Sequence, residues 1–86
     1  MLKLELSSDG GRTTLRLIGR VQSTHLGEIT AQIGMGGPKV TLDLEDVTIV
    51  DVDVVRFLCT CEREGTQLLN CPPYVREWIS REGERT

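Results

Sequence analysis

The stretch from Val40 to Leu58 decides the fold, and it reads Val-Thr-Leu-Asp-Leu-Glu-Asp-Val-Thr-Ile-Val-Asp-Val-Asp-Val-Val-Arg-Phe-Leu. Two runs of β-branched and apolar residues, Val40–Leu44 and Val47–Val50, predict strands. Beyond Asp51 the apolar residues recur at helical spacing, which predicts a helix. Asp51 therefore stands where a strand gives way to a helix, and aspartate is a preferred N-cap at such a position.

Working outward, the rest of the chain also alternates between strand and helix patterns. The alternation from Leu2 to Leu6, a turn cluster at Ser7–Gly11 and the run Thr13–Ile18 predict an N-terminal hairpin. The pattern predicts a helix that contains Leu26, Ile29 and Ile33, with a cap at Ser23 or Thr24 and an end at Gly34–Pro38. A strand at Gln67–Leu69 and a helix from Pro73 follow it. We expect one α/β domain over residues 1–86, a small mixed sheet of four to five strands with three or four helices packed on it.

The composition is that of a small globular domain. Of the 86 residues, 38% are hydrophobic and 27% are charged, a balance that argues against disorder. The net charge is −3 and the Lys and Arg residues form no cluster, so we expect no binding to nucleic acid or to an anionic membrane. No apolar run approaches the length of a membrane span, and three cysteines without a secretory framework favour the cytoplasm.

The cysteines and the single histidine do not have the spacing of a metal site. Cys59 and Cys61 are two residues apart on a predicted helix, so their side chains point about 200° apart. Cys71 and His25 would have to converge from elsewhere to complete a zinc site. We therefore expect no metal, no cofactor and no enzymatic activity, and we interpret the thiols as structural.

Four short motifs occur in an order that resembles the STAS domain, which is shared by anti-sigma factor antagonists and the cytoplasmic tails of sulfate transporters. They are Leu15-Arg-Leu-Ile-Gly19, Leu42-Asp-Leu44, Ile49-Val50-Asp51 and Gly65-Thr-Gln-Leu-Leu69. In that family a strand ends in an Asp-Ser-(Ser/Thr)-Gly turn that starts a helix. The resemblance implies a bacterial signalling module that takes part in transcription regulation by binding a protein.

The turn itself departs from the family pattern. Val52 stands at the position of the family's phosphoacceptor hydroxyl, Asp53 at the next position and Val54 at the turn glycine. A serine kinase has no oxygen to phosphorylate at Val52, so the resemblance does not extend to the phosphorylation switch. Asp53 supplies a permanent charge instead, although a carboxylate carries less charge than phosphoserine.

By resemblance, the predicted partner-binding residues form the turn and helix that follow β-type residues 47–50. They are Asp51, Val52, Asp53, Val54 and Arg56. The partner would be an anti-sigma factor-like kinase or another signalling component. From the residues alone, Asp51 is also explained as an N-cap and Arg56 as a surface residue that pairs with a nearby carboxylate.

Two other functions stay open. The chain could be an assembly subunit, even a weak homodimer, that pairs through a sheet edge or through the helix carrying Tyr74 and Trp78. These two aromatic residues are otherwise predicted to complete the core, and they become candidates for an interface if their helix is half exposed. A small-ligand site built on Asp51, Asp53 and His25 is the weaker alternative, because it requires a convergence that the sequence does not predict.

Overall fold

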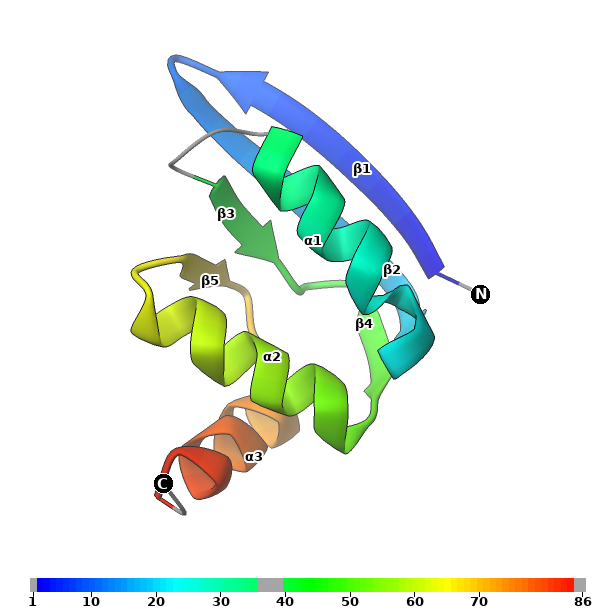
Figure 1. Cartoon of the computed structure of the whole chain (residues 1–86), viewed down its shortest axis with the longest axis vertical. Helices are drawn as coiled ribbons and strands as arrows, with labels where there is room; N and C mark the ends of the chain where they lie inside the picture. Colours follow the sequence, from blue (N-terminus) through cyan, green and yellow to red (C-terminus); the bar gives the residue numbers. More distant parts are fainter. Residues whose placement is uncertain (1, 36–39, 85–86) are drawn as a thin grey trace.

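The strand β2 (Arg12–Val21) is the centre of a five-stranded sheet (Figure 1). The computed structural model describes residues 2–35 and 40–84. The other strands are β1 (Leu2–Asp9), β3 (Val40–Asp43), β4 (Val47–Val50) and β5 (Gln67–Leu69). β1 pairs with β2 antiparallel, β3 and β4 pair with β2 parallel, and β5 pairs with β3 parallel. The predicted mixed α/β sheet is confirmed.

Three α-helices and one short 3₁₀ turn accompany the sheet. They are η1 (Ser23–His25), α1 (Leu26–Met35), α2 (Val52–Arg63) and α3 (Pro73–Glu84). Strand residues such as Leu15, Leu17 and Leu42 join buried residues of all three α-helices in one core cluster. In Figure 1, β1 and α3 lie toward opposite ends of the long axis, with α2 packed against α3. None of the helices within the described residues has both the length and the apolarity needed to cross a bilayer.

β3 and β4 follow one another along the same side of β2. β3 pairs with Thr13–Arg16, whereas β4 pairs with Gly19–Val21, and the ladder shifts register beside Gly19. Gly19 has a φ of +98°, and its N–H donates to the carbonyl of Asp46 in the break between the two strands, at 3.0 Å. A positive φ is readily adopted by glycine, so this residue lets β2 bend and accept both strands. β4 ends at Val50, and Asp51 follows it directly.

The N-terminal hairpin is confirmed, but its turn is shorter than predicted. β1 continues through Ser7 and Ser8 to Asp9, and the turn consists of Gly10 and Gly11 with φ values of +58° and +84°. Two consecutive residues with positive φ form the type of turn that matches the twist of paired strands. Two glycines were therefore sufficient, and the polar residues before them remain in the strand.

The observed boundaries of α2 and α3 agree with those predicted from the sequence, and the boundaries of α1 agree in part. Gly65, with φ +98°, ends α2 as predicted, and α3 begins at Pro73. The predicted cap at Ser23 or Thr24 is wrong, because these residues lie within η1 and the Gln22 N–H donates to His25 Nδ1 at 3.0 Å. α1 is described to Met35, and the rest of the turn predicted at Gly34–Pro38 lies outside the described residues.

Candidate partner-binding site

Asp51 joins two turns through the two oxygens of its carboxylate. Its backbone is extended (φ −103°, ψ 176°), and Oδ1 accepts a hydrogen bond from the Val54 N–H at 3.0 Å. Oδ2 accepts a hydrogen bond from the Ser23 N–H, at the start of η1, at 2.8 Å. The predicted N-cap is confirmed, and the contact with Ser23 adds a function that the local sequence could not reveal. One side chain therefore fixes the β4–α2 turn against the β2–η1 turn.

These contacts also set the charge of Asp51. The hydrogen bond from the Val54 N–H, and after it the bond from the Ser23 N–H, lowers the pKa of the Asp51 carboxyl below its usual value of 3.8. The group is therefore ionised at neutral pH, and both oxygens are engaged in positioning the backbone. This engagement argues against a small-ligand site on Asp51, Asp53 and His25, because the carboxylate already has its partners and His25 Nδ1 is bonded to Gln22.

The structure separates the other four predicted residues into exposed and buried ones. Val52 is 37% exposed and Asp53 is exposed, whereas Val54 is only 1% exposed and belongs to the core. This burial differs from the prediction that Val54 contacts a partner. The side chain of Val54 lies on the buried face of α2, together with Val55 and Leu58, and faces the core. Its backbone N–H still contributes by holding Asp51.

Arg56 lies one turn further along α2 and reaches toward α3. Its Nε is 3.5 Å from Oε2 of Glu82, and 61% of the Arg56 side chain is exposed compared with 12% for Glu82. The predicted pairing with a nearby carboxylate is confirmed. The pair connects the start of α2 with the outer face of α3.

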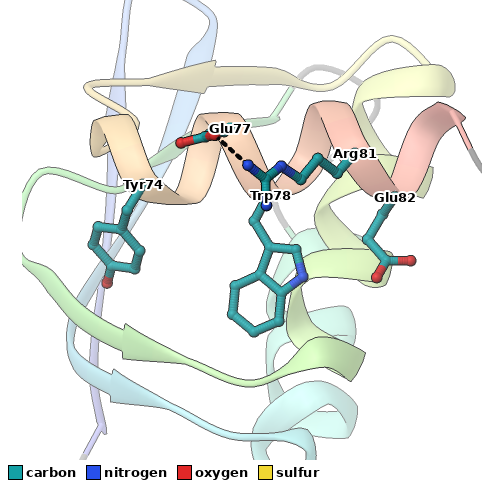
Figure 2. Close-up of a pocket in the computed structure, with 5 residues that line it drawn as sticks. All are labelled: Tyr74, Glu77, Trp78, Arg81 and Glu82. Atoms are coloured by element: carbon teal, nitrogen blue, oxygen red, sulfur yellow. Dashed lines mark hydrogen bonds and ion pairs between the residues drawn. The ribbon is translucent and has the colours of Figure 1, made fainter.

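A groove of about 340 Å³ lies on that face of α3 (Figure 2). It is lined by Tyr74, Glu77, Trp78, Arg81 and Glu82. Figure 2 shows the rings of Tyr74 and Trp78 projecting from the same side of the helix, while Glu77 and Arg81 form an ion pair along it at 2.7 Å. The groove is open and carries both apolar rings and charges.

Tyr74 is the residue whose predicted burial is wrong. It is 46% exposed, and its hydroxyl donates to the carbonyl of Thr48 on β4 at 2.5 Å, whereas Trp78 is half-buried against the core. The polar tip of the ring is satisfied at the edge of the sheet, so the ring covers β4 without entering the core. Only Val75 and Ile79 of α3 are buried, so the condition set for an interface role, a half-exposed helix, is met. The sequence signal for this groove was the four-residue spacing of the two rings, with Glu82 four residues further on.

Two exposed apolar residues, Ile49 and Val52, lie in the segment between Thr48, which binds Tyr74, and the start of α2. Ile49 is 52% exposed and follows Thr48, the residue whose carbonyl binds Tyr74. Val52 comes two residues after the buried Val50. We give the name docking surface to five exposed residues and the half-buried Trp78 around this junction: Ile49, Val52, Asp53, Arg56, Tyr74 and Trp78. It combines apolar anchors with charges, which is typical of protein interfaces.

The three thiols are part of the packing. Cys61 is 9% exposed, and burial raises its pKa to about 11. Burial also raises the pKa of Cys59, whose Sγ donates to the Ile79 carbonyl at 3.2 Å, and that of Cys71. Thiols with raised pKa are poor nucleophiles. Within residues 2–35 and 40–84, no group of three or more His, Cys, Asp or Glu side chains could hold a metal ion.

Comparison with known proteins adds a fold but no close relative. No family model and no curated protein matches this sequence. Among solved structures, the anti-sigma factor antagonist SpoIIAA in its unphosphorylated form is 21% identical, with a TM-score of 0.67 over 93% of this chain and 82% of that one. The STAS domain of an anti-sigma factor antagonist from Rhodobacter sphaeroides is 22% identical, with a TM-score of 0.55 over 81% and 85% of the two chains.

A third solved structure, Mglu, is 18% identical with a TM-score of 0.56, and it covers 80% of this chain but 19% of its own. Identities this low are informative about the fold alone. The chain is therefore a STAS-like domain in its fold, as the sequence motifs predicted.

Proposed function

We propose that this chain is a non-enzymatic interaction module of the anti-sigma factor antagonist type, which binds a protein partner through the docking surface. The fold supports the proposal, because two of the solved structures that share it are named as anti-sigma factor antagonists. The observation that carries it is the exposure of Val52, Asp53 and Tyr74 beside a turn that Asp51 holds rigid. A preformed surface loses little entropy when a partner binds.

Recognition depends on shape and fixed charge in this proposal. The apolar residues Ile49, Val52 and Tyr74 provide anchors that bury against the partner, and Asp53 and Arg56 set its orientation. By its resemblance to antagonists, the chain would bind an anti-sigma factor-like kinase or another signalling component.

Serine phosphorylation does not regulate the turn in this proposal. Val52 offers no hydroxyl, and Asp53 stands at the next position of the turn with a carboxylate side chain. Binding would then be governed by the concentration of the two proteins, since the charge at the turn cannot be switched on or off.

The proposal is tested by capture followed by affinity measurement. The immobilised wild-type chain is exposed to the native lysate, and each protein that it retains is purified. We expect Val52→Glu and Tyr74→Ala each to weaken binding of the partner among these proteins by about tenfold or more, and Asp53→Ala by less. Glu28→Ala, an exposed change on α1, serves as the matched control. Unchanged affinity in all three docking-surface variants would overturn the proposal.

A further inference from the structure

β1 forms an edge of the sheet, and its outer side has no strand beside it in the described residues. It is the longest of the edge strands among the described residues, with eight residues compared with four in β4 and three in β5. In an antiparallel ladder every second residue directs its N–H and C=O away from the neighbouring strand. β1 therefore presents a row of backbone donors and acceptors that another strand could bind.

We infer that β1 pairs antiparallel with β1 of a second copy, about a twofold axis that passes through Leu4. The segment Leu2-Lys3-Leu4-Glu5-Leu6 has leucines at alternate positions and opposite charges on either side of Leu4. In this register Lys3 lies opposite Glu5 of the second copy, and Glu5 lies opposite Lys3 of the second copy. A twofold interface uses the same patch on both molecules, so the single segment supplies both halves of two complementary pairs.

The charges select this register against its neighbours. An antiparallel ladder centred on Lys3 places two lysines opposite each other, and one centred on Glu5 places two glutamates opposite each other. A parallel, in-register ladder repeats both like-charge contacts. Charged residues on an edge strand usually prevent pairing, but this pair of charges opposes the alternative arrangements and favours one. Within one chain Lys3 Nζ lies 3.5 Å from Oε2 of Glu5, and the two side chains are 70% and 47% exposed. An exposed pair of this kind is weak, so each charge can exchange its partner for the opposite charge of a second copy.

The leucine face of β1 agrees with the same register. Leu6 is 43% exposed, whereas Leu2 and Leu4 are half-buried against the core. Pairing about Leu4 brings Leu6 next to Leu2 of the second copy and Leu4 next to its equivalent, on the face that carries the core. The exposed leucine would then be covered by a continuous apolar row along both strands.

The predicted dimer is weak and leaves the docking surface accessible. A ladder of five residues from each copy buries less than a standard stable interface, so we expect a dissociation constant between about 10 µM and 1 mM. β1 pairs with one side of β2, whereas β4, the strand whose Thr48 carbonyl binds Tyr74, pairs with the other side. The dimer would therefore carry two docking surfaces, and its existence does not depend on the proposed function.

Reversal of the charge at Lys3 or at Glu5 tests the register of the proposed ladder directly. Sedimentation equilibrium up to about 1 mM protein should show a concentration-dependent dimer for the wild-type chain. Lys3→Glu places Glu opposite Glu in both pairs, and Glu5→Lys places Lys opposite Lys, so each variant should dimerise about tenfold or more weakly. An equimolar mixture of the two variants should form a heterodimer, because the complementary pairs are restored between them.

Two matched variants control for net charge. Arg81→Glu and Glu84→Lys make the same charge changes at exposed positions on α3 and should leave the dimer unchanged. Circular dichroism verifies that all four variants remain folded. The inference is overturned if the wild-type chain is monomeric at 1 mM, if Lys3→Glu and Glu5→Lys dimerise as the wild type does, or if their mixture fails to associate. Loss of the dimer in Arg81→Glu alone would place the contact on α3 and would also overturn it.

Discussion

α2 and α3 have the same length of twelve residues, yet they bury very different surfaces. α2 buries four residues, namely Val54, Val55, Leu58 and Cys61, whereas α3 buries Val75 and Ile79 and leaves Tyr74 nearly half exposed. The apolar residues of α2 therefore stabilise the core, while some of those on α3 remain available to a partner. The candidate site lies where the two helices meet, because the first fixes the geometry and the second supplies exposed aromatic surface.

The two helices also begin differently. α2 starts at a charged cap, Asp51, and carries Asp53 in its first turn, whereas α3 starts at Pro73 and has no acidic residue in its first turn. Negative charge at a helix N-terminus is favourable. The start of α2 is therefore the one whose stability depends on the ionisation of a carboxylate. This difference and the difference in burial give four predictions.

The largest effect is expected from the core. Leu58→Ala removes a side chain that is 1% exposed and should lower the free energy of unfolding by about 3 kcal/mol. Tyr74→Ala should cost about 1.5 kcal/mol, because the ring is 46% exposed and one hydrogen bond to Thr48 is lost. Urea denaturation of both variants measures the difference. Equal losses would show that α3 is anchored as firmly as α2.

The next effect concerns the cap. Asp51→Ala removes both hydrogen bonds and should lower the stability by about 1.5 kcal/mol. Asp51→Asn retains an oxygen acceptor for one of the two N–H groups, so it should lose less. The comparison uses chemical denaturation at pH 7, and a larger loss for Asn than for Ala would contradict the assignment of Asp51 as a cap.

The stabilisation by the Asp51 cap should depend on pH. The change in stability with pH should be smaller than the loss caused by Asp51→Ala, and it should arise at the start of α2. Because the pKa of Asp51 is lowered in the folded state, its charge stabilises the fold above the usual pKa of 3.8. This stabilisation is lost as the pH falls through the lower pKa of the folded state. The stability difference between the wild type and Asp51→Asn should therefore be full at pH 7 and shrink below about pH 4. Denaturation at several pH values measures it, and a difference that stays constant down to pH 2 would refute the expectation.

The smallest effect is expected from the ion pair that joins the helices. A double-mutant cycle with Arg56→Ala and Glu82→Ala should give a coupling of about 0.5 kcal/mol, because Arg56 is largely exposed. The coupling should decrease in high salt. A coupling of several kcal/mol would mean that the pair, more than the apolar contacts, holds α3 on α2.

The fold was largely predictable because its signals are local. The signals for the strand at Val47–Val50, the cap at Asp51, the end of α2 at Gly65 and the start of α3 at Pro73 each act on neighbouring residues. Spacing along the sequence was therefore enough to place them. Gly10 and Gly11 are an instructive exception. The surrounding serines also favour turns, but two glycines can complete a hairpin without them, and pairing with β2 kept Ser7 and Ser8 in the strand.

The candidate site was predictable only in part, because its geometry depends on contacts between distant segments. The bond from Ser23 to Asp51 spans 28 residues, and the bond from Tyr74 to Thr48 spans 26. An aromatic residue at helical spacing is predicted to be buried, and only the position of β4 shows that Tyr74 covers the sheet edge with its hydroxyl satisfied. Val54 illustrates the reverse case, since the turn motif suggested contact with a partner while the helix period buried it.

The shared carboxylate of Asp51 has a consequence for the motions of the molecule. The amides of Ser23 and Val54 donate to the same carboxylate, that of Asp51. If one of these hydrogen bonds breaks, the carboxylate that accepts the other bond is disturbed as well. In hydrogen exchange, the two amides should behave as one cooperative opening unit, although one begins η1 and the other lies in α2. A partner that protects the start of α2 would then also slow exchange at Ser23, on a segment that it does not touch.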